Sequence, residues 1–161
     1  MLESILRVTL RPAVESDGPL LFKWANSPDC LAGKLQTSEP IPRDVHDRWF
    51  RTRLASGTCW IWILEVNAHP CGQLRVELKG GFYELDIYVV PEFRRHGIAA
   101  CAIREALRHL ACAISGEEIV ARVRPANHPS KRLFQSVGFS HSETERDHIV
   151  FRLSVGSGGT P

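Results

Sequence analysis

The sequence lacks the features that would tie it to a membrane or a polyanion. No apolar run approaches the roughly 20 residues of a membrane-spanning helix, and residues 1–20 lack the apolar segment of a secretory signal. Lys and Arg together number 20 against 18 Asp and Glu, so the net charge of +2 is not the basic excess of a nucleic-acid binder. We therefore expect a cytoplasmic protein with no membrane or nucleic-acid partner.

The cysteines lack the number and spacing that two kinds of site require. The five cysteines are odd in number and include no C-x-x-C, which predicts neither a disulfide framework nor a zinc site. Cys101 and Cys112 fall on a helical pattern, so we interpret them as small core residues. The spacing does not indicate a nucleophilic Cys–His pair. We expect no metal.

What is present fits one folded domain. The chain has 161 residues, of which 43% are hydrophobic, enough for a single core. We place one domain over residues 1–153 and a flexible Gly/Ser-rich tail over residues 154–161. The sequence leaves open whether the protein is a monomer or a homodimer.

The first third is predicted to contain a strand over residues 6–10 and two helices. Asp17 caps the first helix, which Pro28 ends, and the second runs from Pro42 to residues 56–57. Residues 29–41 are predicted to be irregular. The buried helix faces are assigned to apolar residues at helical spacing: Leu20, Leu21 and Trp24, then Val45, Trp49 and Leu54.

Strands dominate the remainder, with two further helices. Residues 59–66 and 73–78 form a hairpin across 67–70, and residues 82–90 form a third strand after a Gly-Gly turn. A helix from Ile98 to about residue 115, a strand over 119–123, a helix over 129–137 and two antiparallel strands follow. This order predicts a mixed α/β sheet.

The sharpest motif is the strand-to-helix junction at residues 89–99, which reads VVPEFRRHGIA. The first amides of a helix have no internal partners, and the helix dipole adds positive potential there, so such a terminus binds phosphate. Gly97 permits close backbone approach, Arg94 and Arg95 add charge, and Ala99 is small. The junction therefore favours a pyrophosphate ligand.

A second motif follows the next strand, at residues 127–139, NHPSKRLFQSVGF. Its residues also suit a plain capped helix with a glycine stop. Together the two motifs resemble the GNAT acyltransferase superfamily, which uses acetyl-coenzyme A (acetyl-CoA). The pattern Q/R-x-x-G-x-G/A falls on Arg94, Gly97 and Ala99, and N-x-x-S-x-x-L-Y/F-x-x-x-G-F on the second motif. The resemblance spans residues 6–153.

The resemblance implies a mostly antiparallel sheet with splayed central strands and helices on both faces. The backbone from Arg95 to Ala99 would bind the pyrophosphate, and pantetheine would lie where the strand at 88–90 diverges from that at 119–123. A Val89 or Val90 amide would polarise the thioester carbonyl. The implied cofactor-binding residues are Val89, Val90, Arg94, Arg95, His96, Gly97, Ile98, Ala99, Asn127, Ser130 and Phe134.

The resemblance also implies direct attack by an acceptor amine, which needs a general base. Glu84, Asp86 and Tyr88 alternate onto one strand face and are the catalytic candidates. We favour Glu84, because similar enzymes place their base on this strand, with Asp86 second; a merely solvated face is the alternative. Phe134 stands where many members have a Tyr as general acid, so the acid is unassigned.

The N-terminal half resembles one branch, N-acetyltransferases of nucleotide-linked amino sugars in pseudaminic-acid-type biosynthesis. The resemblance rests on residues 10–13, Trp24-Ala25-Asn26-x-Pro28, Ile41-Pro42, His46-x-x-Trp49-Phe50 and 72–75. It implies a nucleotide-linked 4-amino sugar as acceptor. His46, Trp49 and Arg75 are the candidate substrate-binding residues. Two alternatives remain, acetylation of a protein N-terminus and non-catalytic binding of acetyl-CoA.

Overall fold

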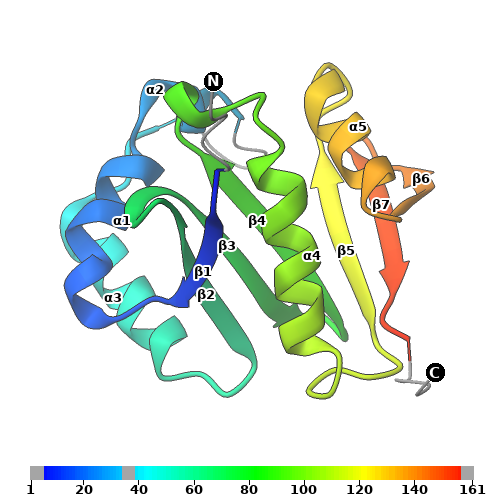
Figure 1. The fold of residues 1–161 in the computed structure, drawn as a ribbon, viewed down its shortest axis with the longest axis horizontal. Helices are drawn as coiled ribbons and strands as arrows, with labels where there is room; N and C mark the ends of the chain where they lie inside the picture. The colour runs from blue at the N-terminus through cyan, green and yellow to red at the C-terminus, as the bar shows by residue number, and fades with distance from the viewer. Residues whose placement is uncertain (1–5, 34–38, 157–161) are drawn as a thin grey trace.

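A seven-stranded sheet organises the fold of the computed structural model, which describes residues 6–33 and 39–156 (Figure 1). The strands follow the order β1-β2-β3-β4-β5-β7-β6, and only β4 and β5 pair in parallel. The predicted mixed, mostly antiparallel sheet is confirmed. The strands are β1 (Val8–Pro12), β2 (Cys59–Val66), β3 (His69–Lys79), β4 (Phe82–Val89), β5 (Glu118–Val123), β6 (Ser140–Thr144) and β7 (Ile149–Ser154).

Helices cover both faces of this sheet, as predicted. On β2, the inward side chains alternate between two clusters: Trp62 and Leu64 join the core beneath α4 and α5, whereas Ile61 and Ile63 pack with α1 and α3. The helices are α1 (Gly18–Ala25), α2 (Pro28–Gly33), α3 (Arg43–Leu54), α4 (Ile98–Leu110) and α5 (His128–Ser136).

The hairpins between β2, β3 and β4 use turns that the sequence signals. Asn67 and Ala68 both have positive φ, 50° and 66°, as the tight turn of a twisted two-residue hairpin requires. Gly80 and Gly81 make the next turn with φ of 58° and 92°. These turns fix the register that brings Gly72 opposite Val89.

The parallel pair β4–β5 is joined only near its start. Its register contains Tyr83 opposite Ile119 and Glu84 opposite Val120, and the pairing extends no further along β4. In Figure 1, α4 lies across the line where the two strands diverge. The pair therefore has a closed end at Tyr83–Glu84 and an open end at Val89, which matches the expected splay.

Two predictions about the N-terminal helices are wrong. Residues 28–33 form α2 rather than an irregular segment, while 34–38 lie outside the described residues. On α3, Trp49 and Leu54 pack against the core as predicted, but Val45 is 47% exposed, and the buried residues are His46 and Phe50. The rings of Phe22, Trp49 and Phe50 surround the imidazole of His46. These aromatic contacts explain why His46 is buried and Val45 is not.

Three further expectations need correction. Asp17 precedes α1 but does not cap it, because its carboxylate binds Arg11 and the Val14 N–H. Cys101 and Cys112 are exposed rather than buried in the core. The chain is ordered past the predicted start of the tail, since Ser154 belongs to β7 and Val155 is buried.

Candidate active site

Among the residues that the structure describes, no strand pairs with β4 on its β5 side at the open end. Hydrogen bonds in an antiparallel pair involve alternate residues, and here the Val90 N–H donates to the Cys71 carbonyl at 2.9 Å. The N–H of Val89 is consequently directed away from β3, toward β5, where the β4–β5 ladder has ended. Of the two amides considered for the thioester carbonyl, only that of Val89 faces the gap.

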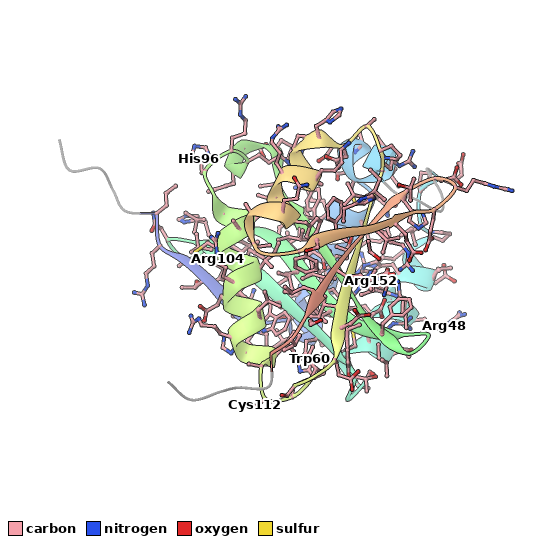
Figure 2. The ribbon with its side chains drawn as sticks, turned by 90° about the vertical axis from the view of Figure 1, so that its right-hand side faces the viewer. Arg48, Trp60, His96, Arg104, Cys112 and Arg152 are labelled. Carbon is pink, nitrogen blue, oxygen red and sulfur yellow. The ribbon has the colours of Figure 1, made fainter. Side chains whose placement is uncertain are left out.

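Beside this edge, the chain turns into the N-terminus of α4. A short 3₁₀ turn over Pro91–Phe93 leads to Arg95 and Gly97, whose φ values are 64° and 72°, and α4 begins at Ile98. A Cβ at Gly97 would meet no atom within 4 Å, so this backbone is open to a ligand. Figure 2 places His96 beside this end of α4 and Cys112 at the other. The geometry suits an anion bound by the amides from Gly97 onward.

The second motif forms the start of α5 on the β5 side of the opening. Asn127 caps the helix, its Oδ1 accepting from the Ser130 N–H at 3.1 Å. The ring of Phe134 is only 5% exposed and packs against Phe139 and Phe151. Asn127 is therefore at the surface, whereas Phe134 supports the core.

Glu84, Asp86 and Tyr88 share one face of β4 but lie in different surroundings. Glu84 is at the closed end, where its carboxylate binds Lys79 at 3.0 Å and also Arg122. Asp86 is exposed and accepts from Gln73 Nε2 at 2.9 Å. At ~3.4 Å per residue, the Cα of Glu84 is about 17 Å along the strand from Val89 and that of Asp86 about 10 Å.

Tyr88 adjoins the open end and is partly enclosed. Its hydroxyl lies 3.2 Å from Ser27 Oγ and donates to Asp29 Oδ1 at 3.4 Å, while its ring packs beside Trp24. Burial, more than the neighbouring charges, raises the pKa of the Tyr88 phenol. Tyr88 therefore stays protonated at neutral pH.

Ser27 and Asp29 are site residues that the sequence interpretation missed. Both lie at the α1–α2 junction, within or next to the segment predicted to be irregular. The signal was present, because Ser27-Pro28-Asp29 has a polar residue, a Pro and an acid in the order typical of a helix start.

Arg94 adopts an orientation that its motif did not reveal. Its Nε donates to the Val89 carbonyl at 2.7 Å, and its terminal nitrogen binds the Asp29 carboxylate. Burial acts to raise the pKa of Asp29, but the hydrogen bonds from Arg94 and Ser27, with the charge of Arg94, lower it overall. Arg94, Arg95 and His96 are all exposed, and the side chain of Arg94 is directed to Val89 and Asp29.

The three predicted substrate-binding residues are only partly brought together. The Arg75 guanidinium lies 5.0 Å from the centroid of Trp49 and pairs with Glu77 at 3.4 Å. His46 is 3% exposed in the α1–α3 interior and cannot reach a ligand at the surface without a rearrangement. The stacked pair of Arg75 and Trp49, which we call the Arg75–Trp49 unit, lies over β3. His46 instead supports the packing of α1 against α3.

The side chain of Asn26 links two segments of the resemblance to the amino-sugar branch. Its Nδ2 donates to the Ile41 carbonyl at 3.1 Å, and its Oδ1 accepts from the Ile41 N–H at 2.7 Å. These two hydrogen bonds connect the Trp-Ala-Asn and Ile-Pro segments, so Asn26 has a structural role here.

Within residues 6–33 and 39–156, no cluster of three or more His, Cys, Asp or Glu side chains could hold a metal ion. None of the helices described there is long and apolar enough to cross a membrane.

Comparisons with known proteins agree with this geometry. The family model of the acetyltransferase (GNAT) domain matches residues 7–140, whereas a comparison with curated protein sequences finds no significant match. Among solved structures, spermidine N-acetyltransferase from Vibrio cholerae, in complex with CoA and spermine, superposes with a TM-score of 0.76 and 17% identity, covering 90% of this chain and 92% of that chain.

Two further structures were determined with the coenzyme. A proposed acetyltransferase from Salmonella typhimurium with acetyl-CoA gives a TM-score of 0.78 at 18% identity over 96% of this chain and 98% of that one. An aminoglycoside acetyltransferase in complex with coenzyme A gives 0.76 at 16% identity over 92% and 95%. These likenesses show the fold, and the family match covers most of the sequence. The chain therefore belongs to the GNAT acetyltransferase family.

Proposed function

We propose that the protein transfers the acetyl group of acetyl-CoA to a primary amine at the open end of β4–β5. The observation that carries the proposal is the Val89 N–H, which faces an unpaired strand edge beside the Gly97 start of α4. One site then offers amides for a pyrophosphate and a donor for a carbonyl oxygen. The coenzyme bound in the solved neighbours supports the same assignment.

In this proposal, acetyl-CoA supplies an activated thioester and the chain supplies binding, orientation and proton transfer. The amides from Arg95 to Ala99 bind the pyrophosphate, aided by the exposed Arg95 and His96. Asn127 and Ser130 line the β5 side of the pantetheine arm. The Val89 N–H stabilises the negative charge that develops on the acyl oxygen when the amine attacks.

Asp86 is the base that the geometry supports best. Direct attack needs a neutral amine, so a carboxylate must take a proton from the ammonium form, directly or through water. Glu84, the first choice from sequence, is held between Lys79 and Arg122 at the closed end, whereas Asp86 is exposed and nearer the opening. Tyr88 is a protonated hydroxyl at the opening, and we propose it as a proton donor where Phe134 has none.

For the acceptor, we propose a nucleotide-linked 4-amino sugar. The support is the N-terminal resemblance together with the Arg75–Trp49 unit, a cation stacked on an aromatic ring near Asp86. The Glu77 carboxylate satisfies much of the charge of Arg75, so a phosphate would have to compete with it. Two of the solved neighbours carry a polyamine or are named for aminoglycosides, which also present primary amines.

The test has two stages, coenzyme binding and an acceptor screen. A ligand that binds only the folded state raises the melting temperature Tm by mass action, so millimolar acetyl-CoA should raise it, and an unchanged Tm would refute the coenzyme assignment. The screen compares nucleotide 4-amino sugars with their 4-hydroxy counterparts, N-terminal peptides and polyamines. Turnover of peptides alone would replace the sugar acceptor, and binding without any turnover would leave a non-catalytic binder.

A further inference from the structure

Three segments that are distant in the sequence meet at the side chain of Arg94. Its Nε donates to the Val89 carbonyl at the end of β4, and its terminal nitrogen binds Asp29 in the first turn of α2. The guanidinium also lies over the ring of Tyr88, 5.6 Å from the centroid. One side chain therefore contacts the strand end, the tyrosine and the α1–α2 junction.

These contacts occupy Nε and one terminal nitrogen, two of the three guanidinium nitrogens that could bind a phosphate. A guanidinium binds anions through paired N–H donors, and here the donors are directed to a backbone carbonyl and a carboxylate. Asp29 neutralises the charge of Arg94, while the neighbouring Arg95 is exposed. The side chain of Arg94, the first residue of the pyrophosphate motif, is thus 43% exposed but directed toward protein groups, and its charge is already paired.

We infer that Arg94 is a positioning residue, which fixes the backbone of Val89 at the open end and ties the α1–α2 junction to it through Asp29. The inference rests on the proposed function, since Val89 provides the donor for the acyl oxygen. The carbonyl and the N–H of Val89 lie in successive peptide planes that meet at its Cα, so a carbonyl held at 2.7 Å restrains the backbone on one side of the donor. A donor acts best when its direction is set in advance. Asp29 and Ser27 hold the Tyr88 hydroxyl beside the same point.

The consequence is that Asp29 and Arg94 should act on turnover as one unit. Arg94→Ala and Asp29→Asn should each lower kcat about tenfold and change the acetyl-CoA Kd by less than about threefold. The double variant should lose little more than either single variant, because each change breaks the same contact. Arg94→Lys should remain impaired, since an ammonium cannot present the planar fork.

The alternative, that Arg94 binds the pyrophosphate, predicts a different pattern. Arg94→Ala would then raise the Kd, Arg94→Lys would restore binding, and Asp29→Asn would free the guanidinium and tighten binding. Arg95→Ala is the contrasting variant, expected to weaken coenzyme binding more than turnover. Arg48→Ala, an exposed arginine on α3, is the matched control for loss of charge (Figure 2).

Two readouts separate positioning from a general loss of structure. The Tm of each variant is measured, and the NMR shift of the Val89 amide should move in the ligand-free Arg94→Ala protein but not in Arg48→Ala. Wild-type kcat in both Arg94→Ala and Asp29→Asn, or the pyrophosphate pattern, would overturn the inference and leave the proposed function intact. A wild-type protein that does not bind acetyl-CoA would instead refute the proposed function.

Discussion

Both ends of the β4–β5 pair carry ion pairs between a carboxylate and a cationic side chain, but the two ends differ in structure. At the closed end, the strands are hydrogen-bonded at Tyr83 and Glu84, and Glu84 is enclosed by Lys79 and Arg122. At the open end, the strands have separated, and a charged pair, Arg94 with Asp29, holds the strand edge from the side. The closed end completes the sheet, whereas the open end leaves backbone groups for a ligand.

This difference shows why residue type alone does not choose between the two candidate bases, Glu84 and Asp86. Glu84, Asp86 and Tyr88 occupy equivalent positions of one strand face, yet only the last two are near the opening. A carboxylate held by two cations, as Glu84 is, supports structure and is less accessible to an incoming amine. Glu84 and Asp86 have the same chemistry, so it is their position along β4 that distinguishes the structural carboxylate of Glu84 from the candidate base Asp86.

The largest expected effect is loss of coenzyme binding in Gly97→Glu. A side chain at φ 72° is strained, and a carboxylate beside a pyrophosphate repels it by several kcal/mol, about 10³-fold in Kd. Gly116→Glu is the matched control, because Gly116 also has positive φ, 81°, and open space but lies on the closed side of the crossover. Equal coenzyme binding in the two variants, measured by calorimetry, would contradict the prediction that the coenzyme binds at the open end.

The next effect separates the two carboxylates. Asp86→Asn should lower kcat about 100-fold and remove the acidic limb of the pH–rate profile, as expected when a general base is lost. Glu84→Gln should instead lower Tm, because Lys79 and Arg122 lose their partner, and keep the wild-type pH dependence. A pH profile altered by Glu84→Gln and unaffected by Asp86→Asn would reverse the assignment.

A third prediction concerns the fit of the strands at the open end. A Cβ on Gly72 would lie 2.2 Å from the Tyr88 carbonyl, so Gly72→Ala must push β3 and β4 apart. Overpacking of this kind costs about 2 kcal/mol, which lowers Tm by roughly 4–8 °C. Gly57→Ala, near the closed end, meets nothing within 4 Å and should leave Tm nearly unchanged. A similar Tm in both variants would contradict the close approach.

The smallest effects are opposite pH dependences of stability. At the closed end, burial acts to raise the pKa of Glu77, but Arg75, Lys79 and Arg53 lower it overall. Its contribution to stability is complete above the unfolded value of about 4.3 and is lost as pH falls through the lower folded value. At the open end, burial raises the pKa of Tyr88, so its contribution is complete below about 10 and is lost as pH rises through the folded value.

Thermal unfolding measured against pH tests this contrast. Glu77→Gln should change only the acidic limb of the Tm profile, and Tyr88→Phe only the alkaline limb, each by a few degrees at most. An alkaline effect in Glu77→Gln would show that the two ends are not electrically separate.

The sequence predicted the elements that depend on local signals. The hairpins follow from the turn residues at 67–68 and 80–81, and both motifs lie at the predicted strand–helix junctions. On α3, the prediction for Val45 was wrong because a histidine such as His46 can be exposed as a polar residue or buried among aromatic rings, and the sequence does not show which rings surround it. The direction of Arg94 was beyond sequence reasoning, since its partner Asp29 lies 65 residues away and a motif gives positions rather than rotamers.

The most direct test of the central claim is a residue-resolved NMR titration of the protein with acetyl-CoA. We predict that the amides of Val89 and Gly97 shift with a common saturation curve, while those of Tyr83 and Gly116 remain in place. Saturable shifts confined to the closed end, or no shift at millimolar acetyl-CoA, would contradict the assignment of the open end as the acetyl-transfer site.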